Sequence, residues 1–347
     1  MRGYQSMKNI LLLRWCIAIA ISIVVAGCKF DNSTLGLMPE STGRSGEVLL
    51  VMDEKMWNGE IGDTVSAWLR QEVLVLPQYE PTFRVIRIKP SAYNDMFQKA
   101  RNVIVTDVDP SYTKAEFRVE TDKFARPQVY ITLKAPSDSV LLKSWYNVQN
   151  YVLDTITRAE QARFLYGFSK YHDVLVEESI AKRHGIDMLV PTSGFNLDVD
   201  STHFVWISKE TQTSSQGILL FDFPYNGPSD FDMQNLVRRM DSVLMLNVPG
   251  DAVGSYMAIE KRIEPIKKEY IRNNNYLCEL RGLWETEGDF MGGPFVSQSI
   301  VDTVDHKLVT AFAYVYGGKG DKKKLLWQLE AIISTFNIHY DAENKVN

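Results

Sequence analysis

Apolar residues recur with two different periods along the chain, and these periods predict strands and helices in mixed order. Period-two alternation and short apolar runs predict strands at 47–52, 83–88, 102–108, 115–120, 128–133, 217–222, 255–259, 276–284 and 308–316. Helical spacing predicts helices at 63–71, from Ser91, from 138 to 184 with a break near Gly167, near Asp232, at 264–272 and at 322–336. Amphipathic helices beside mixed strands, with a hairpin near 304–308, predict an α+β fold with largely antiparallel sheets.

The order of these elements in the second half of the chain repeats the order in the first half. Residues 46–53 (GEVLLVMD) have a counterpart in residues 217–222 (GILLFD), and an Asn-Gly pair follows each, at 58–59 and 226–227. The offset between matched positions grows along the chain, as insertions after a duplication would cause. The sequence therefore predicts a tandem duplication of one α+β unit. The alternative is that two α+β segments of similar length look alike by chance.

The N-terminus has the features of a secretion signal. Three basic residues precede an apolar run at 15–25, which is shorter than the roughly 20 residues that a membrane-spanning helix needs. Residues 25–28, VAGC, resemble the lipobox of bacterial lipoproteins, in which the cysteine carries lipids after cleavage. We therefore expect a signal peptide at 1–27, lipid on Cys28 and a polar tether at 28–45. The alternative is an ordinary signal peptide followed by a buried cysteine.

Composition and charge narrow the class of protein. With 45% apolar and 23% charged residues the chain is globular, and we expect a first α+β unit at 46–185, a second at 186–340 and a tail at 341–347. A net charge of −5 without a basic block argues against nucleic acid as a partner. Once the signal and the lipidated cysteine are set aside, only Cys278 is left, so no intramolecular disulfide is expected. Its apolar neighbours predict a buried, inert thiol.

Residues 281–295, RGLWETEGDFMGGPF, are the first candidate site because they carry three acids in five positions. Alternate residues of a strand share a face, so Glu285, Glu287 and Asp289 are expected on a solvated face. Glycosidase acids face each other across the scissile bond, and calcium needs six to eight oxygens. A solvated strand face is therefore preferred, and a catalytic or metal site is the alternative. A similar pattern at 120–127 (ETDKFARP) predicts that both stretches are strands ending at a proline-marked corner.

A second candidate lies at 317–324 (GGKGDKKK), between a predicted strand and a predicted helix. The backbone around Gly318, Lys319, Gly320 and Lys322 is suited to binding an anion, although the Walker pattern is absent from the sequence. The alternative is a capped, solvated first helical turn. The five histidines are scattered without metal-ligand spacing, so neither a metal nor a cofactor is expected.

Three stretches together point to a family: HFVWISKETQTSSQGILLFDFPYNG (203–227), VPGDAVGSYMAIE (248–260) and ELRGLWETEGDFMGGPFVS (279–297). They resemble an uncharacterised family of Bacteroidota lipoproteins, domain of unknown function 4837, over a region from about Arg44 to Phe336. The resemblance implies a lipid-anchored envelope protein. It supplies no activity, ligand or catalytic residue.

These patterns favour a non-enzymatic outer-membrane lipoprotein that binds an envelope protein or takes part in envelope assembly. The membrane is its first expected partner, through lipid on Cys28, at either the periplasmic or the surface-exposed face. The alternative is a hydrolase that acts on an envelope polymer, with an acidic site near 285–289. The sequence does not indicate an oligomeric state.

Overall fold

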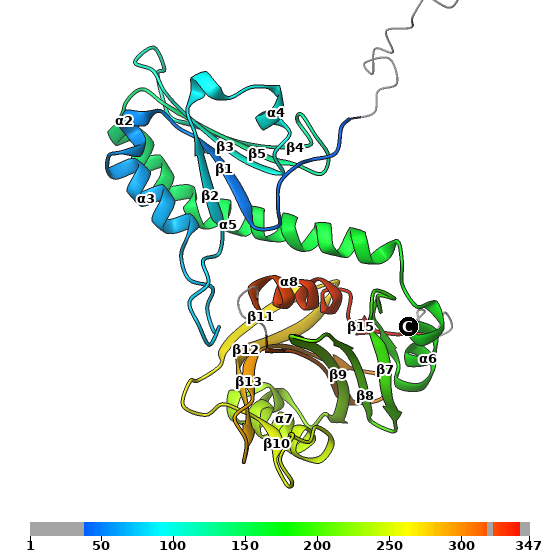
Figure 1. Cartoon of the computed structure of the whole chain (residues 1–347). Coiled ribbons are helices and arrows are strands. Elements are labelled where there is room, and N and C mark those ends of the chain that lie inside the picture. Colours follow the sequence, from blue (N-terminus) through cyan, green and yellow to red (C-terminus); the bar gives the residue numbers. More distant parts are fainter. Residues whose placement is uncertain (1–37, 318–321, 341–347) are drawn as a thin grey trace, which may run out of the picture. The chain divides into compact units, whose positions relative to one another are not determined.

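The first half of the chain, residues 40–169, forms a mostly parallel sheet with helices on both faces (Figure 1). The computed structural model describes residues 38–317 and 322–340. In chain order the elements of this half are β1 (Glu47–Val51), α2 (Glu54–Trp57), α3 (Glu60–Leu69), β2 (Arg84–Ile88), η2 (Pro90–Ala92), α4 (Asp95–Gln98), β3 (Asn102–Val108), β4 (Glu116–Thr121), β5 (Val129–Ala135) and α5 (Asp138–Ser169). The strand order is β2-β1-β3-β5-β4, and only β4, at one edge, runs antiparallel to its neighbour.

Strand β1 shows how this sheet is buried. Its sequence EVLLV is buried from Val48 onward. Val48 and Leu50 pack in one cluster with apolar side chains of α3 and α5. Leu49 and Val51 pack in a second cluster with side chains that include Phe97 of α4. A strand that is covered on both faces has a continuous apolar sequence rather than an alternating one, and β1 has such a sequence.

The second half, residues 173–340, forms an eight-stranded antiparallel sheet. Its elements are α6 (Val174–His184), β6 (Ile186–Asp187), β7 (Asn196–Ser201), β8 (Phe204–Glu210), β9 (Ser214–Pro224), η3 (Pro228–Phe231), α7 (Met233–Asn247), β10 (Tyr256–Ile259), β11 (Ile266–Arg272), β12 (Asn275–Glu287), β13 (Gly292–Asp302), β14 (Lys307–Gly317), α8 (Lys322–Ile333) and β15 (Asn337–Ile338). The strand order is β10-β12-β13-β14-β9-β8-β7. Strand β11 also pairs with β12, and β6 pairs separately with β15.

Helices α7 and α8 cover opposite faces of this antiparallel sheet. Ile218 and Leu220 of β9 belong to the apolar cluster that contains the side chains of α8. Leu219 and Phe221 belong to the cluster that contains the side chains of α7. The central strand β14 is consequently buried along most of its length. The predicted apolar stripe of the helix at 322–336 is confirmed, because α8 directs these side chains onto the sheet.

The α+β fold is confirmed, but the structure does not show the predicted duplication. Strand β1 and the strand at 217–222 would correspond in the two copies. Strand β1 pairs in parallel with β2 and β3, whereas β9 pairs antiparallel with β14 and β8. The two halves therefore have different sheet topologies. The order of elements along a chain fixes neither the partner of a strand nor the direction of pairing.

The predicted helix at 264–272 is wrong. This segment is strand β11, and it pairs antiparallel with β12 over its whole length. Its sequence IKKEYIR contains lysine and glutamate, which fit a helix as well as an edge strand. The hydrogen bonds that decide in favour of the strand come from β12, and local sequence preference does not reveal them.

The long helical region predicted at 138–184 is two helices. The break lies between α5 and α6, at residues 170–173, and not at Gly167, which is inside α5. Gly185 ends α6 as predicted, with the left-handed φ of +67° that glycine adopts without strain. Among the residues that the structure describes, no helix is both long and apolar enough to cross a membrane.

Candidate functional site

The acid-rich stretch 281–295 forms the end of β12, a tight turn and the start of β13. The turn is closed by the Thr286 backbone N–H, which donates to the Met291 carbonyl at 2.9 Å. A Cβ atom on Gly293 would lie 2.0 Å from the carbonyl oxygen of Val315. Glycine is therefore needed at this position for β13 to approach β14, a role in strand packing that requires no ligand.

The predicted strand with a proline-marked corner is correct for 120–127 and wrong for 285–294. The first stretch connects β4 to β5 and the second connects β12 to β13, and both strand pairs are antiparallel neighbours. Pro127 lies in the first connection. Pro294 lies inside β13, opposite Leu283.

The solvated strand face is confirmed for Glu287, which is exposed, whereas Glu285 on the same face is half-buried. Glu285 and Glu287 alternate with the buried residues Trp284 and Thr286 along β12. Asp289 is not on this face, because β12 ends at Glu287 and Asp289 lies in the turn. The catalytic role considered for these acids stays a prediction.

Arg262 connects Glu285 with a second carboxylate, that of Glu260. The Arg262 Nε–H donates to Glu260 Oε1 at 2.8 Å, and Arg262 Nη2 lies 3.1 Å from Glu285 Oε2. The hydrogen bond from Arg262 lowers the pKa of Glu260 to about 2. Burial, together with the negative charge of Glu260, raises the pKa of Glu285. Two neighbouring acids thus have pKa values that are shifted in opposite directions.

Asp289 holds two loops together. Its Oδ1 accepts a hydrogen bond from the Phe290 N–H at 2.7 Å, and its Oδ2 accepts one from the Ala252 N–H at 3.2 Å. Ala252 belongs to the loop between α7 and β10. We call this loop, residues 250–255, and the turn at 288–291 the loop pair.

The loop pair exposes one large apolar side chain on each loop. The relative exposure is 108% for Val253 and 103% for Phe290, so neither side chain is covered by any other group. The 250–255 loop is fixed by its own hydrogen bonds, because the Ser255 hydroxyl donates to the Ala252 carbonyl at 2.6 Å. A single exposed apolar residue is ordinary, but two fully exposed ones on linked, ordered loops indicate a contact surface.

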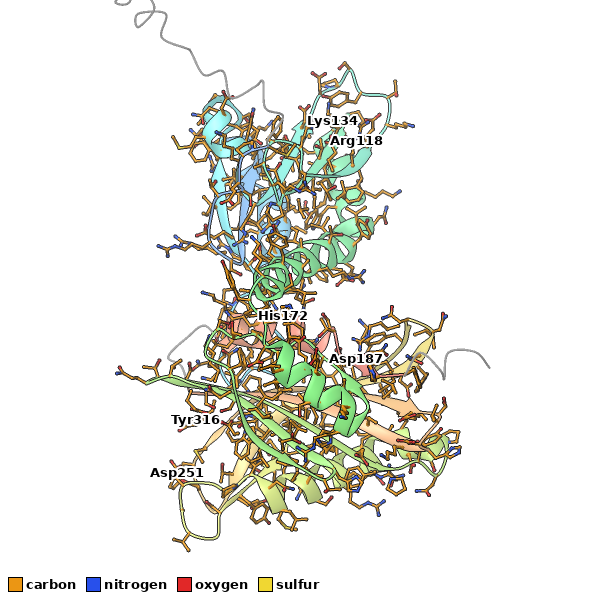
Figure 2. All side chains as sticks on the ribbon, turned by 90° about the vertical axis from the view of Figure 1, so that its right-hand side faces the viewer. Arg118, Lys134, His172, Asp187, Asp251 and Tyr316 are labelled. Atoms are coloured by element: carbon orange, nitrogen blue, oxygen red, sulfur yellow. The ribbon has the colours of Figure 1, made fainter. Side chains whose placement is uncertain are left out.

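Acidic side chains surround these two apolar residues. Asp251 and Glu287 are exposed, and neither forms an ion pair within residues 38–317 and 322–340. Figure 2 labels Asp251 on the outlying 250–255 loop. The last turn of α7 adds Leu246, which is also exposed. This end of the sheet therefore combines apolar side chains with unpaired negative charge.

Sequence reasoning did not find the loop pair. Val253 and Phe290 lie on different loops, and only the folded chain shows that the two loops are linked. The available signal is a shared pattern, GDAVG at 250–254 and GDFMGG at 288–293, in which a large apolar residue comes one or two positions after Gly-Asp in a turn. Turns of this composition ordinarily carry polar side chains.

The glycine-rich candidate is only partly visible. Gly318, Lys319 and Gly320 lie outside the described residues, as does Cys28. Lys322 begins α8, and its backbone N–H donates to Glu80 Oε1 at 3.0 Å. Glu80 comes from the connection between α3 and β2, and its Oε2 accepts the next N–H of α8 at 3.1 Å. A carboxylate of the chain itself therefore binds at this helix N-terminus.

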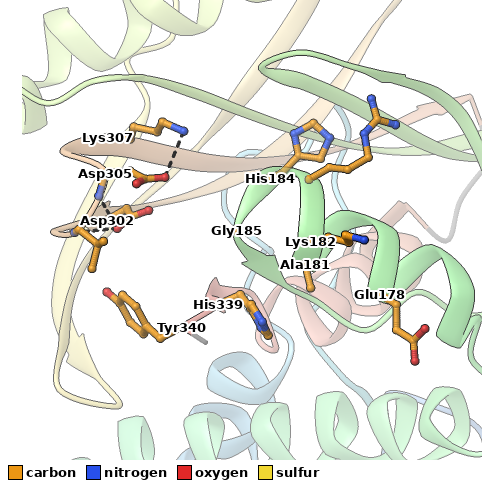
Figure 3. A pocket seen from close by; sticks show the side chains of 12 residues that line it. Glu178, Ala181, Lys182, His184, Gly185, Asp302, Asp305, Lys307, His339 and Tyr340 are labelled. Atoms are coloured by element: carbon orange, nitrogen blue, oxygen red, sulfur yellow. Dashed lines mark hydrogen bonds and ion pairs between the residues drawn. The ribbon is translucent and has the colours of Figure 1, made fainter. Parts of the chain in front are cut away.

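A pocket of about 660 Å³ lies beside α6 and the β13–β14 turn (Figure 3). Side chains of both charges line it, among them Lys182, Asp302 and Lys307. Asp302 Oδ1 accepts the Val304 N–H at 2.9 Å, and Lys307 Nζ lies 3.5 Å from Asp305. Several of these charged groups are thus already bound within the protein. No group of three or more His, Cys, Asp or Glu residues in the described ranges is placed to hold a metal ion.

Comparison with known proteins divides the chain between two families. Residues 41–168 match the family described as domain of unknown function (DUF8532), and residues 173–335 match the family described as domain of unknown function (DUF4837). The predicted resemblance to the second family is thus confirmed for residues 173–335, and the expectation that it begins near Arg44 is corrected. No curated protein matches the chain.

One similar solved structure is titled "Crystal structure of LpqN involved in cell envelope biogenesis of Mycobacterium tuberculosis". It has 12% sequence identity and a TM-score of 0.27, and the match covers 45% of this chain and 83% of that chain. The family models are therefore the informative comparison. Residues 173–335, which include the antiparallel sheet and the loop pair, form a region of the family described as domain of unknown function (DUF4837).

Proposed function

We propose that this chain is a lipid-anchored, non-enzymatic binding protein of the cell envelope. Lipid on Cys28 holds it at the outer membrane, and the loop pair binds an envelope protein. The predicted tether at 28–45 is too long at its C-terminal end, because the Ser41 N–H donates to the Arg126 carbonyl at 3.0 Å and the Thr42 N–H donates to the Lys99 carbonyl at 2.8 Å. We propose that the residues between Cys28 and Glu40 connect the anchor to the folded part.

The full exposure of Val253 and Phe290 carries this proposal. Covering a side chain of this size stabilises a complex by about 1.5–3 kcal/mol. Aromatic side chains at the centre of a contact are frequently those that contribute most to binding. The backbone of Phe290 is also fixed before binding, because its N–H donates to Asp289 Oδ1 at 2.7 Å, so little backbone freedom is lost on docking.

Site-specific photo-crosslinking in intact cells tests the binding surface. A photoreactive phenylalanine analogue at position 290 is expected to give a discrete adduct with one envelope protein. The matched control is position 271, because Ile271 is also exposed but lies on β11, opposite Tyr276 at the far end of β12. Equal adducts from both positions, or none from position 290, would contradict the proposal.

The anchor has a separate test. Replacing Cys28 with serine is expected to abolish metabolic labelling with an alkynyl fatty acid and to move the chain from the membrane fraction to the soluble fraction. Retention of the label in this variant would show that the lipid is attached elsewhere.

A hydrolase with an acidic site near 285–289 is the second candidate, and the opposite pKa shifts of Glu260 and Glu285 are the observation that favours it. Glu285→Gln distinguishes the two functions, because Glu285 is not part of the loop pair. An enzyme that uses Glu285 would lose its cellular phenotype in this variant while staying folded. A binding protein that uses Phe290 would keep its phenotype.

A further inference from the structure

We infer that the partner of the loop pair is a protein surface with an apolar pocket that is rimmed by lysine and arginine side chains. This inference rests on the proposed function and names the chemistry of its partner. Two features of the loop pair support this inference. The first is the acidic rim, which consists of Asp251, Glu287 and Asp289, and the second is the closeness of these acids to the exposed apolar side chains.

The acidic rim determines the charge of the partner. Asp251 precedes Val253 by two residues, and Asp289 directly precedes Phe290. Glu287 is exposed at the end of β12, beside the turn. A surface that covers Val253 and Phe290 must also approach these carboxylates and remove part of their water. Such removal is unfavourable unless cationic groups of the partner replace the water.

In residues 38–317 and 322–340, no basic side chain forms an ion pair with Asp251, Glu287 or Asp289. Lys261 and Arg262 follow β10, but β10 runs away from the loop pair, so they lie past its far end. Lys261 lies 3.9 Å from Asp241, and Arg262 is bound to Glu260 and Glu285. Within the described part of the chain the rim acids therefore have no cationic partner, and cations of a binding partner can pair with them.

A lipid bilayer does not suit the loop pair. Inserting Phe290 below the headgroups would carry Asp289, the adjacent residue, to the same depth, and Val253 would carry Asp251. Carboxylates are unfavourable at that depth. Anionic headgroups would in addition repel all three rim acids. A protein pocket with a basic rim accepts the apolar side chains and the acids together.

The two loops also have the rigidity that docking into a pocket requires. Asp289 links them through the Ala252 N–H, and the Gly250 N–H donates to the Ser255 carbonyl at 2.9 Å. The two apolar side chains are therefore presented as one preorganised pair. We expect Phe290 to enter the pocket and Val253 to cover its edge.

The test begins with the protein that is cross-linked from position 290, which is identified by mass spectrometry, purified and titrated against the chain. Phe290→Ser is expected to weaken binding by at least about tenfold, and Glu287→Lys by about tenfold, because this reversal places like charges together. The matched control is Asp154→Lys, which reverses an exposed acid on α5 and should leave the Kd unchanged. Binding of the wild-type chain should also weaken as salt is raised.

Vesicles of phosphatidylethanolamine and phosphatidylglycerol provide the bilayer arm, with a Cys28→Ser chain that begins at residue 28 and therefore has neither the apolar run at 15–25 nor a lipid. No sedimentation with vesicles is expected. Vesicle binding that is lost on Phe290→Ser overturns the inference in favour of a membrane. If a partner is cross-linked from position 290 but its Kd is unchanged by Glu287→Lys, the inference that the pocket of the partner has a basic rim is wrong. The proposed function would still stand. Absence of any protein adduct overturns the proposed function itself.

Discussion

Replacing Glu160 of α5 with alanine is expected to lower the free energy of unfolding by about 3–5 kcal/mol. The Glu160 side chain is fully buried, and four other residues contact its carboxylate. Arg163 Nη1 donates to its Oε1 at 2.6 Å, and Asn102 Nδ2 donates to the same oxygen at 2.8 Å. The Ser45 hydroxyl donates to Oε2 at 2.8 Å, and Arg101 Nε lies 3.3 Å from Oε1.

The expected loss follows from what the substitution leaves behind. Without the carboxylate, the neighbouring guanidinium groups of Arg101 and Arg163 lose the counter-charge that both of them contact. Burial already lowers the pKa of Arg163 to about 10, which shows how poorly this place solvates a cation. Removing one partner of a buried ion pair costs about 3–5 kcal/mol for this reason. Glu160→Gln keeps an acceptor oxygen and loses the charge, so its stability should lie between wild type and Glu160→Ala.

Urea unfolding followed by tryptophan fluorescence measures the effect. With a slope of about 3 kcal/mol/M, the Glu160→Ala midpoint should fall by about 1–1.7 M urea. The control is Glu120→Ala, because Glu120 pairs with Lys123 at 2.8 Å on the surface, where an ion pair contributes at most about 1 kcal/mol. A midpoint for Glu160→Ala equal to that of Glu120→Ala would refute the argument that buried charges stabilise this half.

Three further predictions follow from single contacts. Glu80→Ala should lower stability by about 1–2 kcal/mol in urea unfolding, because two N–H groups at the start of α8 lose their acceptor; an unchanged midpoint would mean that water replaces the carboxylate without cost. Burial raises the pKa of Asp241, so its contribution to stability is present at low pH and is lost as pH rises through the folded-state pKa. Asp241→Asn, which keeps an acceptor for the Ile259 N–H, should therefore be more stable than wild type at neutral pH, and the difference should vanish below the usual aspartate pKa of about 4; a variant less stable at both pH values would contradict this. Burial also raises the pKa of Cys278 to about 11, so in a chain with Cys16→Ser and Cys28→Ser a disulfide reagent at pH 8 should react only after unfolding; rapid reaction of the folded chain would show that the thiol is accessible.

The local features of this fold could be predicted because they depend on neighbours in the sequence. Strand β1 has an apolar run, and α8 has an apolar stripe with helical spacing. The end of α6 follows from Gly185, which adopts a left-handed φ. The alternation that places Glu285 outward and Trp284 inward is the period of a single strand. The apolar surroundings of Cys278 similarly indicated that its thiol is buried.

Other features depend on pairing between distant segments, which the sequence does not display. The strand at 266–272 exists because β12 offers it hydrogen bonds, and its own residues fit a helix equally well. The parallel pairing of β1 and the antiparallel pairing of β9 distinguish two halves whose elements follow one another in similar order. Glu80 caps a helix that begins 242 residues later. No local period records such a contact.

The acid-rich stretch shows the same division within one short segment. Sequence alone determined that Glu285 and Glu287 lie on one face of a strand, opposite the buried Trp284 and Thr286. Only the tertiary structure placed Asp289 in the turn, joined it to Ala252 and brought Phe290 and Val253 to neighbouring loops. The physical reason is that strand alternation is set by backbone geometry, residue by residue, whereas the loop pair is set by the packing of β10 against β12.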